Sequence, residues 1–185
     1  MYKRNQGEHF GIIPLNIYGF KNDKQISILI DFLKDIFPYI KILEISISNL
    51  ENLKTKLLPV KNYSTLEIDN SEYQVSLNTI ILCDESKLAA GQMNERGLVN
   101  LSFIDNILCR QEMPIEFFKN VIFFPTNSPI IIFSQYRSIF KGSWAYQING
   151  VDVKETEINE NLKMKFRQYL LILKTETLNI ELGKD

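Results

Sequence analysis

Two uninterrupted apolar runs, Val121 to Phe124 and Ile130 to Phe133, constrain the fold of this 185-residue chain more than any other feature. A strand with one face in water alternates apolar and polar side chains. A short run without alternation is typical of a strand that is buried on both faces. We therefore expect central strands at 121–124 and 130–134, in a sheet that helices cover.

The N-terminal part predicts a strand, a helix and a second strand. Apolar residues alternate over 13–17, and Pro14 cannot donate to a ladder, so the strand begins there or lies at an edge. A helix follows, with Asn22 or Asp23 as its N-cap and apolar residues at spacings of three and four. The β-branched segment 40–47 completes a βαβ unit, most simply a right-handed parallel crossover.

The remaining patterns predict further elements in chain order. They are a short helix at 49–58, strands at 64–68 and 73–83, an exposed loop at 84–97, a short helix at 103–109, a hairpin at 144–153, a helix at 157–174 and a closing strand at 178–182. We expect the hairpin near a sheet edge and the long C-terminal helix over one sheet face. The predicted fold class is α/β or α+β, a mixed sheet flanked by helices, and residues 1–185 contain no linker that would divide them into two domains.

Composition and termini predict a cytoplasmic protein. Cys83 and Cys109 both lie in apolar surroundings, outside any CxxC pair, and are expected to be buried free thiols. Neither a signal peptide nor a run of about 20 apolar residues is present in the sequence given. Residues 61–120 carry nine acidic against five basic side chains. Because nucleic-acid binders usually present a basic stripe, DNA or RNA is disfavoured as the main ligand.

The sequence lacks the common catalytic fingerprints. His9 is the only histidine, which removes metal sites that need two histidines, and no GxGxxG, GxxxxGK[ST], GxSxG or HExxH motif occurs. We expect no cofactor and no metal site, and the chain is more simply a non-enzyme.

One enzymatic alternative remains. Glu85-Ser86-Lys87 ends an apolar strand and Asp69 lies sixteen residues upstream. This pattern resembles the acidic-then-ExK motif of the restriction-endonuclease-like nucleases, in which two carboxylates bind Mg²⁺ and a lysine assists the attack of water. The resemblance covers about twenty residues, and it departs from the family in lacking a proline before Asp69. The simpler alternative is a charged strand end followed by a solvated loop.

A second constellation is aromatic and basic. Tyr136, Arg137 and Trp144 belong to the residue types that dominate protein-binding hot spots. The alternative is that Trp144 and Tyr146 fill the core beneath the predicted hairpin. Long polar loops are often functional, which makes the 84–97 loop the other candidate region. The predicted binding residues are Asp84, Glu85, Glu95, Arg96, Tyr136, Arg137 and Trp144.

The leading hypothesis is a small protein that binds another protein, for example an inhibitor or immunity-type protein whose partner is more basic. Acidic surface speeds encounter with a basic partner and favours its selection. The alternative is the Mg²⁺-dependent nuclease that uses Asp69, Glu85 and Lys87.

Overall fold

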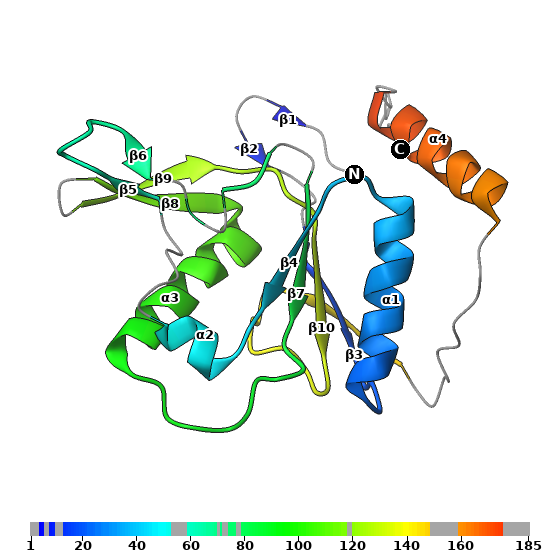
Figure 1. Ribbon diagram of the computed structural model, residues 1–185, viewed down its shortest axis with the longest axis horizontal. Coiled ribbons are helices and arrows are strands. Elements are labelled where there is room, and N and C mark those ends of the chain that lie inside the picture. Colours follow the sequence, from blue (N-terminus) through cyan, green and yellow to red (C-terminus); the bar gives the residue numbers. More distant parts are fainter. Residues whose placement is uncertain are drawn as a thin grey trace, which may run out of the picture.

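The computed structural model describes residues 4–5, 8–9, 13–52, 59–69, 71, 74–76, 79–117, 120–148 and 159–175. Their arrangement is shown in Figure 1. The helices are α1 (Asp23–Ile36), α2 (Ile47–Glu51), α3 (Glu95–Asp105) and α4 (Glu160–Thr175), and the π-helical turn η1 (Asn106–Arg110) continues α3. The strands are β1 (Arg4–Asn5), β2 (Glu8–His9), β3 (Leu15–Tyr18), β4 (Ile40–Glu44), β5 (Val60–Lys61), β6 (Ile68–Asp69), β7 (Ile80–Asp84), β8 (Glu112–Phe117), β9 (Asn120–Pro125), β10 (Ile130–Ser134) and β11 (Trp144–Gln147).

The larger sheet has five strands in the order β11-β3-β10-β7-β4, and every neighbouring pair is parallel. The predicted fold class is confirmed, with its N-terminal βαβ unit of β3, α1 and β4 and its C-terminal helix α4. Asn22 caps α1 by accepting a hydrogen bond from the backbone N–H of Gln25. Strand β3 begins directly after Pro14, inside the sheet, so the proline marks the start of the strand.

Both faces of the five-stranded sheet are covered, as Figure 1 shows: α1 lies on one side, and α2 and α3 lie on the other. Successive residues of β7 alternate between two cores. Ile80 and Leu82 belong to the cluster that contains Ile26 of α1. Ile81 belongs to the cluster that contains Ile104 of α3. A strand buried on both faces needs apolar residues at every position, which explains the unbroken runs in β7 and β10.

Strand β10 is central, as predicted, but the central position predicted for 121–124 is wrong. These residues lie in β9, the last strand of a smaller sheet with the order β6-β5-β8-β9. Phe123 is 45 % exposed, and all six residues of β9 are exposed. In the described part of the chain β9 has a single strand neighbour, β8.

Several predicted boundaries also shift. The strand predicted at 64–68 is mostly a turn, because the side chain of Asn62 accepts hydrogen bonds from the backbone and hydroxyl of Ser64. Strand β7 begins at Ile80 rather than at residue 73. Helix α2 ends at Glu51, earlier than predicted, and residues 53–58 lie outside the described residues. Asn94 caps α3 through the backbone N–H of Gly97, so this helix starts well before residue 103.

The loop predicted at 84–97 is confirmed in its central part. Strand β7 ends at Asp84 and α3 begins at Glu95, and the connection has no regular structure. Two parts of the prediction fail. Glu85 is buried rather than exposed, and residues 95–97 form the first turn of α3.

The C-terminal elements differ in their neighbours from what the sequence predicted. Among the described strands, β11 lies at the edge of the larger sheet and pairs in parallel with β3. The return strand of the predicted hairpin lies outside the described residues. Helix α4 contacts α1 and does not cover a sheet face. The ammonium nitrogen of Lys163 lies 2.8 Å from a carboxylate oxygen of Asp35 at the end of α1. The closing strand predicted at 178–182 also lies outside the described residues. Within the described chain, no helix has the length and apolar character that a bilayer-spanning segment requires.

Candidate functional site

The connection from β10 to β11, which we call loop 135–143, creates the main surface feature of the five-stranded sheet. Because the two strands are parallel, this loop must return from the carboxyl end of β10 to the amino end of β11. Parallel crossovers of a dozen or more residues usually contain a helix. Loop 135–143 is shorter and contains no helix, so it crosses the sheet as an irregular segment.

A buried amide holds this loop against the sheet. The Asn16 side chain in β3 is fully buried, donates hydrogen bonds to the Ser134 hydroxyl (2.8 Å) and the Ile132 carbonyl (3.3 Å), and accepts one from the Ser138 backbone N–H (3.1 Å). A buried amide with all these partners fixes the geometry around it, because losing any one leaves a polar group unsatisfied. Asn16 therefore joins β3, β10 and loop 135–143.

Glu85 supplies a second anchor. It is 5 % exposed, and one of its carboxylate oxygens accepts a 2.7 Å hydrogen bond from the Ser138 hydroxyl. Burial raises the pKa of Glu85, and the neighbouring charge of Asp84 acts in the same direction. Hydrogen bonds from Ser138 and from the backbone of Ile139 oppose that rise in pKa. Glu85 thus serves as a buried acceptor for the loop, in contrast to the exposed position that the sequence predicted.

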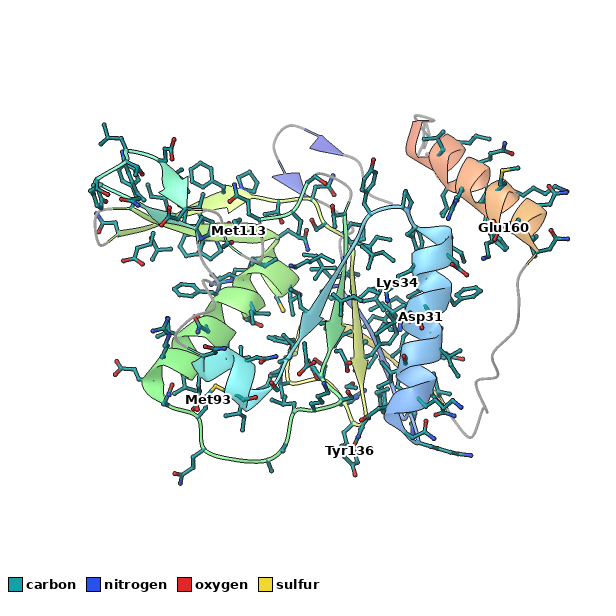
Figure 2. The ribbon with its side chains drawn as sticks, in the orientation of Figure 1. Asp31, Lys34, Met93, Met113, Tyr136 and Glu160 are labelled. Atoms are coloured by element: carbon teal, nitrogen blue, oxygen red, sulfur yellow. The ribbon has the colours of Figure 1, made fainter. Side chains whose placement is uncertain are left out.

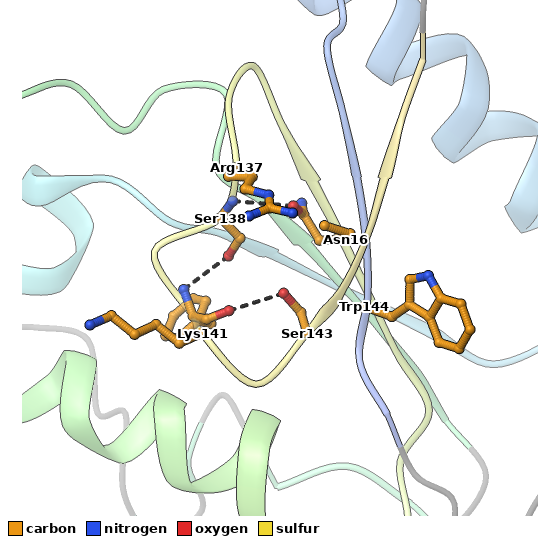
Figure 3. Close-up of a pocket in the computed structure, with 8 residues that line it drawn as sticks. Asn16, Arg137, Ser138, Lys141, Ser143 and Trp144 are labelled. Carbon is orange, nitrogen blue, oxygen red and sulfur yellow. Dashed lines mark hydrogen bonds between the residues drawn. The ribbon is translucent and has the colours of Figure 1, made fainter.

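A pocket of about 510 Å³ lies between loop 135–143 and the sheet, as Figure 3 shows. Its lining consists of Asn16, Arg137, Ser138, Phe140, Lys141, Ser143, Trp144 and Ala145. Loop 135–143 supplies most of these residues, and Asn16 of β3 and Ala145 of β11, which are register partners, lie on the side of the sheet.

The turn between β3 and α1 does not form a phosphate site. In nucleotide-binding sheets, glycines in the turn before the first helix let phosphate oxygens approach the backbone. Here Gly19 (φ 94°) is followed by Phe20, which is 6 % exposed and packs edge-to-face on Phe133 with the ring centres 5.9 Å apart. The aromatic ring occupies the core at this turn.

Trp144 and Tyr146 lie on the opposite face of the sheet from the pocket interior. Trp144 pairs with Leu15 and Tyr146 with Ile17, and Ile17 packs in the core beside α1. Figure 3 shows the Trp144 ring pointing away from the pocket. Trp144 is 68 % exposed and Tyr146 62 % exposed, so the alternative that they fill the core is wrong. With the exposed Ile13 and Leu15 they form a surface that we call the edge aromatic patch.

The other predicted binding residues are spread over the molecule. Tyr136 is 81 % exposed and projects from the loop at the carboxyl end of the sheet, as Figure 2 shows. Asp84 accepts a hydrogen bond from the Ser86 backbone. Glu95 and Arg96 lie in the first turn of α3, away from the residues that line the pocket. The structure thus groups Arg137 and the Trp144 backbone around the pocket, with Glu85 behind Ser138.

The residues of the nuclease alternative are not brought together. Asp69 lies in β6 of the smaller sheet, whereas Glu85 follows β7 of the larger one. The ammonium nitrogen of Lys87 pairs with Glu44 at 2.8 Å, which raises the pKa of Lys87. Among the described residues, no group of three or more His, Cys, Asp or Glu side chains could hold a metal ion.

Sequence reasoning missed Asn16, Ser134 and Ser138. Asn16 occupies the polar position of an alternating strand, so the pattern predicted that it faces water, and only the position of loop 135–143 reverses this. A signal was nevertheless present, because a polar residue that separates two apolar neighbours inside a central strand needs a partner if the strand is covered on both faces.

The fold and this site together define a class: an α/β protein with a parallel sheet whose edge presents exposed aromatic side chains suited to protein contact. Residues 1–183 match the family described as Mini-chromosome maintenance replisome factor. The chain belongs to this family.

Individual relatives agree with the family match. The chain is 22 % identical over 185 residues to the Mini-chromosome maintenance complex-binding protein of Gallus gallus, covering 94 % of this chain and 29 % of that protein. It is 23 % identical to the protein of the same name from Drosophila melanogaster, covering 97 % of this chain and 32 % of the relative. For Salmo salar the values are 24 % identity, 75 % of this chain and 22 % of the relative. The chain therefore spans less than a third of the length of these relatives.

The family match corrects two predictions. The cytoplasmic location is wrong, because a family described as a replisome factor acts where chromosomal DNA is copied, which points to the nucleus. The inhibitor or immunity role is not supported, since the relatives are named for binding a complex. The broader prediction of a protein-binding family is confirmed.

Proposed function

We propose that this chain is the part of a nuclear protein that binds the Mini-chromosome maintenance (MCM) complex, and that it makes contact through the edge aromatic patch. The names of the relatives support the choice of partner. The observation that carries the choice of surface is the exposure of Trp144 and Tyr146 side by side on the outermost strand, at 68 % and 62 %.

The physical argument is the cost of leaving these side chains in water. Tryptophan and tyrosine bury a large area at little entropic cost, and each also offers a polar group at its rim. Leu15 pairs with Trp144 across the strands and extends the apolar area. Patches of this kind at a sheet edge mark sites of protein interaction.

One domain is the simplest organisation for the function, and we propose it for residues 1–185. Its support is a shared core: Met113 of the smaller sheet packs in the same cluster as Ile132 of the larger sheet and Ile104 of α3. The two sheets therefore present their surfaces as one body.

The test is affinity capture of the MCM complex from the same organism. The wild-type chain should capture it, and Trp144→Ala combined with Tyr146→Ala should weaken binding by about 30-fold or more, as expected when a hot spot of about 2 kcal/mol is lost. Tyr39→Ala is the matched control, because Tyr39 is 63 % exposed and lies outside the patch. Equal capture by the wild type and the double variant would contradict the proposal that the edge aromatic patch makes the contact. Failure of the wild type to capture the complex would contradict the proposal that the MCM complex is the partner.

The more basic partner expected from the sequence remains a prediction. Its support is the acidic excess of residues 61–120, which carry nine acidic and five basic side chains. Capture that survives loss of the acidic residues Glu95 and Glu112 would count against it.

A further inference from the structure

The pocket under loop 135–143 differs in chemistry from the edge aromatic patch. Its lining contains two basic residues, Arg137 and Lys141, and no acidic residue among those described. Two serines and Asn16 supply the remaining polar atoms. This set of side chains favours an anion.

Arg137 is the most informative of these residues. In the described part of the chain its guanidinium has neither an ion-pair nor a hydrogen-bond partner, whereas Arg167 donates to the Asp35 carbonyl and Lys163 pairs with Asp35. Arg137 and Asn16 both line the pocket, as Figure 3 shows, and Arg137 is exposed to solvent. The planar guanidinium matches phosphate and carboxylate oxygens with two parallel hydrogen bonds, so an unpaired arginine in a pocket is suited to such a group.

The loop that carries Arg137 is held in place. Ser138, the next residue, is fixed by Asn16 through its backbone and by Glu85 through its hydroxyl. Further along, Ser143 donates to the Phe140 carbonyl at 3.0 Å, and Gly142 packs so closely on Cys109 that an added Cβ would lie 2.9 Å from its sulfur. A ligand would therefore meet an ordered loop, and little free energy would be lost in ordering it.

We propose that this pocket binds the phosphate group of a phosphorylated segment of the partner protein. The proposal rests on the proposed function for the partner's identity. A volume of about 510 Å³ accommodates a peptide side chain with its neighbours and not merely a free ion. Arg137 forms the bidentate contact with the phosphate. The Lys141 side chain extends away from Arg137 in Figure 3, so its positive charge acts on the phosphate only at longer range. The buried Glu85 lies behind Ser138 and does not line the pocket.

A peptide fits this pocket better than a nucleotide does. A nucleotide base needs an apolar slot or a stacking ring, but the Trp144 ring points away from the pocket and Phe140 is 3 % exposed. The turn that would hold nucleotide phosphates at α1 is filled by Phe20.

The binding test uses O-phosphoserine as the probe, followed by amide chemical shifts in the intact chain. We expect shifts confined to residues 137–144 with O-phosphoserine and none with serine. Arg137→Gln should weaken O-phosphoserine binding about tenfold or more, the loss expected for a charge-assisted bidentate contact. Arg137→Lys should retain only part of the wild-type affinity for O-phosphoserine. Arg110→Gln, which removes an exposed arginine outside the pocket, should bind as the wild type does.

Three results would overturn the proposal: shifts that persist unchanged in Arg137→Gln, an equal response to serine, or tighter binding of ADP than of O-phosphoserine. A capture experiment separates this proposal from the proposed function. Phosphatase treatment of the MCM complex should weaken capture by the wild type and have no further effect on capture by Arg137→Gln. If wild-type capture is strong and insensitive to phosphatase, the pocket proposal fails while the proposed function stands.

Discussion

The side-chain amide of Asn16, in the middle of β3, donates a 2.8 Å hydrogen bond to the hydroxyl of Ser134 at the end of the neighbouring strand β10. Both residues are buried, and the carbonyl oxygen of the same amide accepts from the Ser138 backbone. One side chain thus connects the centre of the sheet to the loop that carries Arg137.

Replacing Asn16 by Ala should therefore destabilise the fold. The change removes the acceptor of the partly buried Ser138 N–H and the donor to the buried Ser134 hydroxyl, and one unsatisfied buried group costs about 1–3 kcal/mol. Urea denaturation measures the loss. Asn120→Ala, at an exposed position of β9, serves as the control and should change stability by less than about 0.5 kcal/mol. If the two variants were equally stable, the hydrogen bonds of Asn16 would contribute nothing measurable to the free energy of unfolding.

Glu85 predicts a specific dependence of stability on pH. Burial raises its pKa in the folded chain above the ordinary value of 4.5, so over the interval between the two pKa values the unfolded chain has released a proton that the folded chain retains. The unfolded chain then binds fewer protons, and the free energy of unfolding falls as the pH rises through that interval.

The comparison with Glu85→Gln isolates this effect. The wild type should lose stability relative to the variant as the pH is raised from about 4 to about 7, because Gln does not ionise. Urea denaturation at several pH values gives the difference. A difference that stays constant, or one in which the wild type gains on the variant, would mean that Glu85 is not held in a raised-pKa environment.

The strand at 130–134 could be predicted as a central one because it carries a local signal, although the strand order could not be predicted. Residues 130–133 and 80–83 are apolar at successive positions, and both strands pack against clusters on two faces of the sheet. The same signal misled at Val121 to Phe124, where the run is equally apolar but the strand lies at an edge and is exposed. The local pattern shows which side chains a strand carries. Whether those side chains are buried depends on the strand's position in the sheet.

The site was harder to predict because its residues come from distant parts of the chain. Arg137 and Trp144 were predicted from residue type alone. Asn16 and Glu85 acquire their roles only when β3, β7 and loop 135–143 meet, over separations of up to 122 residues. No rule based on residue spacing predicts contacts between segments that are so far apart in the sequence.

Helix α4 is expected to depend on its ion pair with α1. Lys163 lies 2.8 Å from Asp35 of α1 and 2.9 Å from Glu160 of α4 itself, and its side chain is 14 % exposed. Lys163→Met should speed hydrogen exchange of the α4 amides and leave the β10 amides unchanged, because one of the links between α1 and α4 is lost, the hydrogen bond from Arg167 to Asp35 remains, and the central sheet is untouched. Lys165→Met is the control on the exposed side of the same helix. Equal exchange in the two variants would show that other contacts hold α4.

Two phenylalanines ten residues apart provide the sharpest test of the strand arrangement. Phe133 in β10 is fully buried and packs on Phe20, whereas Phe123 in β9 is 45 % exposed. Phe133→Ala should cost about 3–5 kcal/mol, since it removes a buried ring and leaves a cavity. Phe123→Ala should cost less than about 1 kcal/mol, because nearly half of the Phe123 surface is already in water in the folded chain and little of a cavity would be left. Chemical denaturation of both variants measures the difference. Similar losses of several kcal/mol would mean that β9 is buried as deeply as β10, and its placement at the edge of the smaller sheet would then be wrong.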